Sequence, residues 1–310
     1  MNQYAIGIDL GGTVIKLGLV KDNCIIDEEV LTVLSVNGLE LYLPVIRSCI
    51  DRLLQKYQVA LKDLKGIGLA FPGLVDSVSK KVISTNKKYD DAIKLDIESW
   101  VRQTWRASFY IDNDARMAAV GEWKFGAGKG CDNLVVVTLG TGIGSAAIIE
   151  GKVLRGKHFQ AGILGGHIAV NYKGNRCTCG NIGCAEAEAS TWNINTRMKE
   201  DFLFSESLLS KEIKLDFETL FRVAQQNDVL AQKIKDECLQ IWSTTVINLI
   251  HAYDPERVIL TGGILNSGDI IIPAIQKAVD EYAWCPWGVI SVQASTLINK
   301  AAILGVTSCL

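Results

Sequence analysis

Two glycine-rich segments carry residue types that could bind phosphate. The first is Asp9-Leu-Gly-Gly-Thr13, with Lys16 beyond it, and the second is Thr138-Leu-Gly-Thr-Gly-Ile-Gly144. Glycine at a tight turn lets backbone N–H groups approach an anion closely, because no Cβ intervenes, and each threonine adds a hydroxyl donor. An acid such as Asp9 at the end of a strand can hold a Mg²⁺ ion bound to nucleotide phosphates, usually through water. Two such turns could grip a polyphosphate from both sides of a cleft, although either one alone also suits an ordinary hairpin.

The first segment does not have the spacing of the common nucleotide-binding motifs. The Gly-x-x-x-x-Gly-Lys-Ser/Thr spacing of a P-loop is absent from the first segment. A dinucleotide-binding fingerprint needs a helix after its glycines, whereas apolar β-branched residues follow Gly12 and predict a second strand. The nucleotide hypothesis therefore depends on the two turns together.

Asp114 is the best candidate for a catalytic carboxylate. It follows the apolar segment 109–113, which predicts a buried strand, and it precedes residues 115–123, which predict a helix. At such a junction it could accept the proton of a sugar hydroxyl during phosphoryl transfer, while Asn113 could hydrogen-bond other hydroxyls. Alternatively, Asp114 is only the N-cap of the following helix, which is the more common role for such a residue taken alone.

A cluster of metal-ligand side chains follows in the second half of the chain. His167 precedes Cys177-Thr-Cys179-Gly-Asn-Ile-Gly-Cys184. One histidine and three cysteines at short spacing suit tetrahedral Zn²⁺, and four protein ligands leave no open position, so we expect a structural ion. A disulfide would leave one cysteine unpaired, and a redox centre usually has the Cys-x-x-Cys spacing, which this loop lacks.

Two side chains of this cluster could also face a ligand. His167 has a second ring nitrogen that stays free once the first binds the metal. Glu186, two residues after the last cysteine, would be held by the same loop. The metal would then orient a binding wall, although Glu186 could equally be a solvated carboxylate.

The hydrophobic patterns predict an α/β chain with a repeated arrangement. Strands are expected at 4–10, 14–20, about 28–33, 65–70, 109–113, 134–138, 145–150 and 258–261, and helices at 39–57, 115–123, 191–203, 229–251 and from about 270. Two hairpins with glycine turns open two successive halves, which suggests a degenerate internal duplication. With no flexible linker present, the domain boundary is expected inside the helix near Asp114. Residues 1–115 with 292–310 would form one domain, and 116–291 the other.

Composition excludes several classes of protein. The 310 residues are 48% hydrophobic and 21% charged, with a net charge of −2, so a basic surface for nucleic acid is not expected. We find no run long and apolar enough for a membrane span and no signal peptide ahead of the first strand, and we expect a cytoplasmic protein. The six cysteines outside the cluster are expected to be buried, reduced thiols: Cys24, Cys49, Cys131, Cys238, Cys285 and Cys309.

These motifs together resemble the ROK family of repressors, unassigned reading frames and sugar kinases. The resemblance rests on the segments 9–16, 113–115, 140–144 and 166–186 and spans nearly the whole chain. It implies an actin-like (ribonuclease H-like) ATPase fold whose two α/β domains close over Mg-ATP and a sugar. The implied activity is ATP-dependent phosphorylation of a hexose or hexose derivative, with a structural zinc ion and a homodimeric assembly.

The resemblance also implies roles for individual residues. Asp114 would be the general base, and the sugar would contact Asn113, His167, Glu186, Asn86 and Gly73, the last within Phe71-Pro-Gly73. The nucleotide would be bound by Asp9, Gly11, Gly12, Thr13, Lys16, Gly140, Thr141 and Gly142, with Gly262 and Gly263 flanking the adenosine. The zinc ligands would be His167, Cys177, Cys179 and Cys184.

One position departs from the family pattern. Glucokinases of this family usually carry a glutamate three residues before the zinc histidine, where this chain has Leu164. Loss of such a hydrogen-bonding carboxylate predicts that glucose is not the preferred sugar. A family repressor would need a DNA-reading helix-turn-helix, and the three residues ahead of the first strand are too few for one. A catalytically silent sugar-binding regulator remains the alternative to a kinase.

Overall fold

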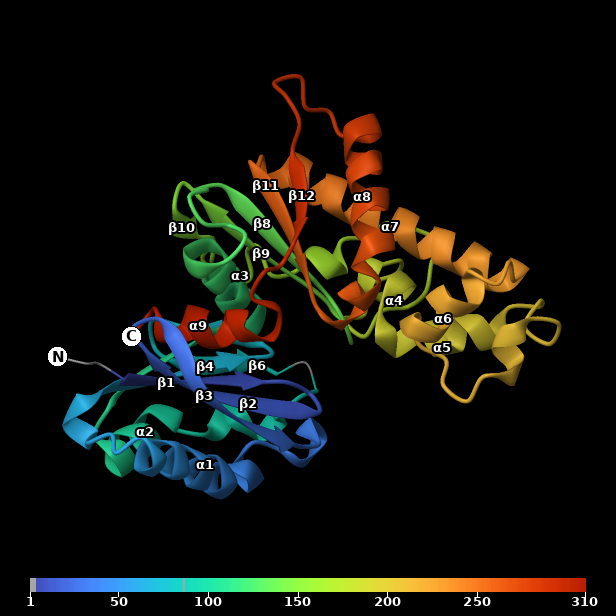
Figure 1. Cartoon of the computed structure of the whole chain (residues 1–310). Coiled ribbons are helices and arrows are strands. Elements are labelled where there is room, and N and C mark those ends of the chain that lie inside the picture. The colour runs from blue at the N-terminus through green and yellow to red at the C-terminus, as the bar shows by residue number, and fades with distance from the viewer. Residues whose placement is uncertain (1–3, 86) are drawn as a thin grey trace. The chain divides into compact units, whose positions relative to one another are not determined.

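The protein is described by a computed structural model that covers residues 4–85 and 87–310, and it divides into two compact units (Figure 1). The first unit runs to Gly130 and also takes in Val153–Ala161 and Leu297–Leu310. The second unit comprises Cys131–Lys152 and Gly162–Thr296. Among the described residues, no helix combines the length and the apolar character needed to cross a bilayer.

The first unit is built on a five-stranded sheet with the order β3-β2-β1-β4-β7. Its strands are β1 (Tyr4–Leu10), β2 (Val14–Lys21), β3 (Cys24–Thr32), β4 (Leu64–Phe71) and β7 (Ser108–Asn113). The first three strands form an antiparallel meander, whereas β4 runs parallel to β1 and β7 runs parallel to β4. Strands β1, β4 and β7 therefore end at the same edge of the sheet, and that edge carries Asp9, the loop after Phe71, and Asp114.

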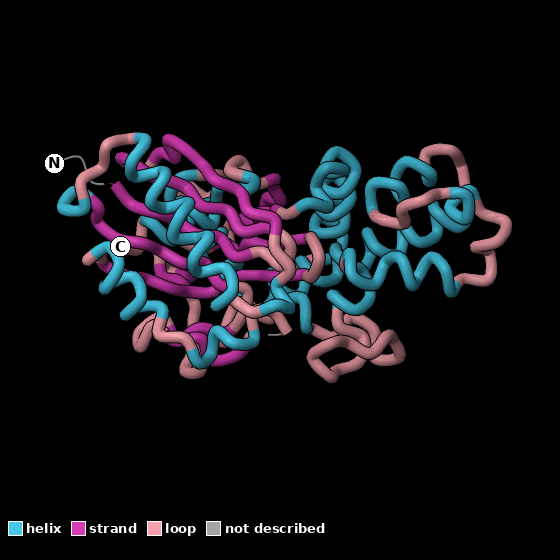
Figure 2. Tube along the Cα trace, turned by 90° about the horizontal axis from the view of Figure 1, so that it is seen from below, coloured by secondary structure: helices cyan, strands magenta, loops and turns pink. Residues whose placement is uncertain are grey.

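Helices cover both faces of this sheet. On one face lie α1 (Leu43–Lys56) and α2 (Ile97–Trp105), and on the other lie α3 (Asp114–Phe125) and α9 (Ala301–Thr307), as Figure 1 shows. Figure 2, seen from below, has the strands of this unit behind the helices of the first face. Because both faces are covered, strands β1 and β4 are almost continuously buried, as expected for strands in a parallel sheet.

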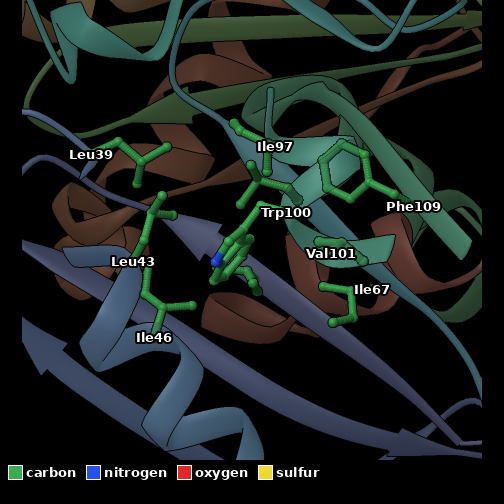
Figure 3. A pocket seen from close by; sticks show the side chains of 10 residues that line it. Leu39, Leu43, Ile46, Ile67, Ile97, Trp100, Val101 and Phe109 are labelled. Atoms are coloured by element: carbon green, nitrogen blue, oxygen red, sulfur yellow. The ribbon is translucent and has the colours of Figure 1, made fainter. Parts of the chain in front are cut away.

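The core beneath α1 and α2 is closely packed. Figure 3 shows ten apolar side chains around a cavity of only about 10 Å³: Ile8, Leu39, Leu43, Ile46, Ile67, Leu69, Ile97, Trp100, Val101 and Phe109. A water molecule needs at least that much room and also polar partners, which this lining does not provide. The cavity is therefore a packing defect of the core and has no room for a ligand.

The boundary between the units differs from the one expected at residue 115. A Cβ on Gly121 would lie 2.0 Å from the Ala301 carbonyl oxygen, and one on Gly305 would lie 1.8 Å from that of Met117, so α3 and α9 pack backbone to backbone. This contact keeps the whole of α3 in the first unit. The buried guanidinium of Arg116 also donates to the carbonyls of Leu154, Phe159 and Ala161, which holds the segment Val153–Ala161 on the same unit.

The second unit repeats the strand order of the first, with β10-β9-β8-β11-β12. Its strands are β8 (Leu134–Leu139), β9 (Ile143–Ile149), β10 (Lys152–Val153), β11 (Arg257–Thr261) and β12 (Ser291–Ala294). Strand β9 is antiparallel to β8, and β11 and β12 continue in parallel. The sequence-based hypothesis of an internal duplication is thus matched by the topology of the two sheets.

Helices complete the second unit: α4 (Ala185–Ala189), α5 (Thr191–Glu200), α6 (Phe217–Ala224), α7 (Val229–Tyr253) and α8 (Gly268–Tyr282). The 25-residue α7 is the longest of them and buries Trp242, whose indole N–H donates to the Ala189 carbonyl at 2.9 Å. This bond ties α7 to the end of α4, the helix that follows the cysteine loop.

Most predicted elements are present, with shifted ends. The helix expected over 39–57 begins only at Leu43, after two short 3₁₀ turns, and the third strand begins at Cys24 instead of about residue 28. Elements without a prediction of their own are α2, α4, α6 and α9, together with β5 (Leu74–Asp76), β6 (Lys81–Ser84), β10 and β12. They are short, and short segments carry little periodic signal.

Candidate functional site

The first glycine turn, Gly11–Thr13, joins β1 to β2 and has free amide groups. The carbonyls of Gly12 and Thr13 accept hydrogen bonds from the N–H groups of Ser35 and Val33 at 3.0 and 2.9 Å. The N–H groups of Gly12 and Thr13 have no acceptor among the described residues. The carbonyl side of the turn is thus tied to the protein, while its amides remain available to an anion.

Asp9, the penultimate residue of β1, lies opposite Lys16 in the β1–β2 register. Burial, helped by the negative charge of Asp114, raises the pKa of Asp9 to about 6, and Lys16 opposes the shift. A buried carboxyl group whose pKa is raised by a second carboxylate nearby favours a cation beside it. The surroundings of Asp9 therefore fit the magnesium role expected from the sequence.

Asp114 is the first residue of α3, directly after β7 ends at Asn113. One oxygen of the Asp114 carboxylate accepts two hydrogen bonds, from the backbone N–H of Ala115 at 2.8 Å and from the side-chain NH₂ group of Asn113 at 3.0 Å. Burial raises the pKa of Asp114, and the positive charge of Lys88 and these hydrogen bonds oppose that shift. A helix N-terminus, two donors and a cation thus offset part of the effect of burial on the Asp114 pKa, which stays raised.

Asn113, and not Asp114, is the N-cap of α3. Its side-chain oxygen accepts from the Arg116 N–H at 3.1 Å, and its NH₂ group donates to the Gly73 carbonyl at 3.0 Å as well as to Asp114. The alternative in which Asp114 only caps the helix is therefore wrong. Asn113, expected as a sugar ligand, is 6% exposed and is engaged by the protein itself.

The loop after β4 contributes Gly73. A Cβ at this glycine would lie 2.3 Å from the Ser84 carbonyl oxygen, so no larger residue fits there without a backbone shift. Gly73 is linked to Asp114 through Asn113, whose side-chain NH₂ group donates to both the Gly73 carbonyl and the Asp114 carboxylate. Asn86, expected to contact the sugar, lies outside the described residues.

The second glycine turn, Gly140–Gly142, repeats the bonding of the first with different partners. Its carbonyls at Gly140 and Thr141 accept from the N–H groups of Thr191 and Trp192, which begin α5. Within the described chain, no acceptor faces the N–H groups of Thr141 and Gly142. This turn therefore also presents amide groups while its carbonyls are occupied.

Gly262 and Gly263 follow β11 at the end next to this second turn. Gly262 has a φ of 104°, and a Cβ there would lie 2.2 Å from the Leu139 carbonyl oxygen, so only glycine fits. Gly263 has open space around it, with no atom within 4 Å of where a Cβ would be. The expected adenosine-flanking residues thus lie directly beside the second glycine turn.

The four predicted zinc ligands converge in the second unit. The ligand atoms of His167, Cys177, Cys179 and Cys184 all lie within 4.8 Å of one another. His167 Nδ1 is 3.5 Å from Cys177 Sγ, and the sulfurs of Cys179 and Cys184 are 3.7 Å apart. Sulfur ligands at the corners of a zinc tetrahedron are separated by about 3.8 Å, given Zn–S bonds of about 2.3 Å. The donor set and its spacing therefore fit zinc.

His167 and Glu186 connect this cluster to the second turn. The Nδ1 atom of His167 faces the thiols, and its Nε2 has no partner among the described residues. Glu186 is 8% exposed, and its Oε2 accepts from the Ile143 N–H at 2.9 Å, directly after the turn. Glu186 is thus not a freely solvated carboxylate. A bound ligand could still use its second oxygen, which accepts no hydrogen bond from the described part of the chain.

The predicted residues therefore fall into two groups. The first unit carries Asp9, Gly11, Gly12, Thr13, Lys16, Gly73, Asn113 and Asp114, and the second carries Gly140, Thr141, Gly142, His167, Glu186, Gly262, Gly263 and the three cysteines. Lys88 and Tyr89 contact the first turn, and the sequence left open whether the stretch 87–91 that contains them shapes the pocket or an interface. Nothing in their local pattern distinguishes them from an ordinary polar loop.

The chain is similar to known proteins over almost its whole length. The glucokinase of Thermotoga maritima is 32% identical, and the match covers 98% of this chain and 96% of that enzyme. The xylose repressor of Bacillus subtilis is 28% identical over 98% of this chain and 76% of the repressor. A ROK family glucokinase from Streptomyces griseus, solved with glucose and AMPPNP, superposes with a TM-score of 0.79 at 26% identity, covering 99% of this chain and 98% of that one.

These similarities confirm the predicted fold class, an actin-like arrangement in which each α/β unit carries one of the two related sheets. Both kinases and repressors occur among the relatives, so activity must be argued from the site. The sequence model of the ROK family matches residues 5–309, and the chain belongs to that family.

Proposed function

We propose that this protein is an ATP-dependent sugar kinase. The observation that carries the proposal is the environment of Asp114, a carboxylate at a helix N-terminus, close to Asp9 and within the field of a lysine. A general base for phosphoryl transfer needs a carboxylate beside the phosphate-binding amides, and Asp114 lies close to Asp9 at the end of β1, the strand that leads into the first glycine turn. The glucokinase relatives support the same conclusion.

In the proposed reaction, Asp114 acts as the general base. The sugar oxygen forms a bond to the γ-phosphorus as the bond from that phosphorus to the β–γ bridging oxygen breaks, and ADP leaves. The hydroxyl proton passes to the Asp114 carboxylate. Asn113 positions this carboxylate by capping α3 and by donating a hydrogen bond to it.

The phosphates would be bound by the free amides of both turns, with Thr13 and Thr141 adding hydroxyl donors. Mg²⁺ would neutralise phosphate charge when bound near Asp9. Without the metal, the positive charge of Lys16 favours the ionised form of the Asp9 carboxylate. Gly262 and Gly263 would border the adenosine. Because the turn carbonyls are already bonded, the amides need no rearrangement to accept an anion.

Zinc would have a structural role and would hold the sugar-binding side chains in place. The four ligands leave no open coordination position, so the metal supplies no catalytic step. His167 Nε2 and the second oxygen of Glu186 would contact sugar hydroxyls. The contact of Glu186 with Ile143 N–H also couples this loop to the second phosphate turn.

The direct test of the activity is ADP formation with Mg-ATP and a panel of hexoses and N-acetylhexosamines. Asp114→Asn should lower kcat by about 10²–10⁴-fold while ATP and sugar still bind, because the change removes the base and keeps the shape. Glu98→Gln, in the first turn of α2, is the matched control and should behave as wild type. Full activity of Asp114→Asn would refute the assigned base.

Sugar preference is a separate part of the proposal. Leu164 is 43% exposed and precedes the turn that carries His167, so it is available to contact a ligand. An apolar side chain there suits an N-acetyl methyl, a deoxy position or an aglycone better than a hydroxyl. Leu164→Glu should raise kcat/KM for glucose relative to the best substrate, whereas Leu164→Gln should do so less. Glucose as the best substrate of the wild-type protein would contradict this assignment.

A catalytically silent sugar-binding regulator is the second candidate. It is favoured by the xylose and N-acetylglucosamine repressors among the relatives. The two candidates differ in one measurement: a regulator would bind a sugar from the panel and release no ADP with any of them.

A further inference from the structure

Lys88 lies where the first glycine turn and Asp114 meet. A Cβ added to Gly12 would be 3.5 Å from Lys88 Cε and 3.9 Å from its Cδ, so the lysine side chain extends over the turn. Its positive charge also acts on the Asp114 carboxyl group. All three residues belong to the first unit, although they are far apart in the sequence.

Tyr89, the next residue, fixes the backbone beneath this lysine. It is 0% exposed and adopts a left-handed conformation with a φ of 57°, which is unfavourable for a bulky side chain. Its hydroxyl donates to the Gly11 carbonyl at 2.6 Å, and its N–H donates to the Ser35 carbonyl at 2.9 Å. Ser35 in turn donates to Gly12. The loop and the turn thus form one hydrogen-bonded body.

Neighbouring residues hold the loop from the other side. The Lys88 N–H donates to the Thr85 carbonyl at 3.0 Å. The Asp91 carboxylate accepts from the N–H groups of Leu39 and Glu40 at 2.6 and 2.8 Å. The backbone of Lys88 is therefore anchored on both flanks.

The Lys88 ammonium group has no carboxylate partner within ion-pair distance in residues 4–85 and 87–310. An ordinary surface lysine would also lack a partner, and Lys87 next to it is such a residue, because it is exposed. Lys88 differs in being half-buried and in lying over a turn whose amides are free. A strained, anchored loop that carries an unpaired cation to free amides is a feature of ligand sites.

We propose that Lys88 is a catalytic residue that binds the transferred phosphoryl group of ATP beside Asp114. This proposal rests on the kinase function proposed above and adds a residue to it. Phosphoryl transfer spreads negative charge over the equatorial oxygens, and a fixed cation lowers the energy of that state. Tyr89 is the positioning residue that keeps the lysine over the turn.

The position of Lys88 also gives it an effect on the base. The charged groups around Asp114 are Asp9 from β1, with Lys16 opposite it on β2, and Lys88 from the loop. Removing the Lys88 charge removes the cation that opposes protonation of Asp114. The acid limb of the pH–rate profile should therefore move to higher pH in a variant without this charge.

The test compares Lys88→Met with Lys87→Met, a matched change in the adjacent exposed lysine, and with Lys88→Arg. Lys88→Met should lower kcat by about 10²-fold or more, Lys88→Arg should recover part of it, and Lys87→Met should match wild type. AMPPNP, which keeps a terminal phosphate, should bind about tenfold more weakly to Lys88→Met, while ADP binds as before. Thermal unfolding verifies that each variant is folded.

The outcomes separate this proposal from the kinase function. Wild-type turnover together with unchanged kcat, acid limb and AMPPNP affinity in Lys88→Met would overturn the role of Lys88 and leave the kinase intact. A wild-type protein that binds AMPPNP but forms no ADP would overturn the kinase, and the AMPPNP-to-ADP affinity ratio of Lys88→Met would then decide the role of Lys88 in phosphate binding. Equal losses for AMPPNP and ADP would also contradict a contact with the terminal phosphate.

Discussion

The two glycine turns occupy equivalent places in two sheets of the same strand order, yet their surroundings differ. In both, two carbonyls are bonded to a neighbouring segment, and two amides have no acceptor in the part of the chain that the structure describes. Asp9 lies opposite Lys16 in the register of the two strands beside the first turn, whereas Thr138 lies opposite Gly144 beside the second. The backbone part of the site is thus duplicated, and the charged part is not.

The second glycine turn has a different neighbour, the side chain of Glu186, which contacts it. Glu186 accepts from the Ile143 N–H, and a Cβ on Gly142 would lie 2.4 Å from its Oε2. The metal-ligand loop leads directly into α4, which carries this glutamate. The comparison teaches that the first unit carries the charged candidate residues, whereas the second carries a turn supported by Glu186 and by the loop that holds the four potential metal ligands.

The largest expected effect concerns that metal. Cys184→Ala should lower the free energy of unfolding by at least about 3 kcal/mol, because a structural zinc site contributes its binding energy to folding. Cys131→Ala, a buried cysteine of the same unit outside the cluster, should cost clearly less. Urea unfolding and metal content by mass spectrometry provide the measurements. If the metal-free protein were as stable as the metal-bound protein, the second unit would not depend on a structural metal, and this difference between the units would be contradicted.

The second prediction tests the charged positions. Asp9→Asn should lower kcat by about 10²–10³-fold, equivalent to about 3 kcal/mol, because magnesium loses its carboxylate. Thr138→Val, at the equivalent place of the second sheet, should have a small effect. Steady-state kinetics over a range of magnesium concentrations is the measurement. Similar losses in both variants would mean that the chemistry is shared evenly between the turns.

The third prediction concerns backbone space at the turns. A Cβ on Gly11 would lie 2.6 Å from the Val14 carbonyl oxygen, whereas a Cβ on Gly140 has no atom within 4 Å. Gly11→Ala should therefore cost about 2 kcal/mol of stability, and Gly140→Ala almost nothing. The free energy of unfolding of the two variants, measured with denaturant, tests this prediction. Equal values would show that the backbone of the first turn shifts to accept a Cβ without loss of stability.

The smallest effect is a dependence of stability on pH in magnesium-free buffer. The pKa of Asp9 is raised from 3.8 to about 6, so the folded state binds the proton more tightly than the unfolded state. The contribution is fully present below pH 3.8 and is lost as pH rises toward 6. Because the side chain keeps some exposed surface, we expect about 1 kcal/mol, less than the full shift implies. Asp9→Asn should abolish this slope, and Thr138→Val should leave it unchanged.

Much of the local structure followed from the sequence. Both hairpins, the junction before Asp114 and the metal-ligand set were predicted from short segments, because hydrophobic period, glycine turns and ligand spacing are local signals. The boundary of the first unit was not predicted correctly. It depends on the contact of α3 with α9, and those helices are separated by most of the second unit.

Tertiary structure alone decided which side chains meet. Asn113 caps α3 and leaves Asp114 available, Glu186 reaches Ile143, and Lys88 extends over Gly12. In each of the last two pairs, dozens of residues separate the partners. Parallel strands joined by long crossovers bring the ends of β1, β4 and β7 to one edge, and no local pattern records which loop then fills the space beside them.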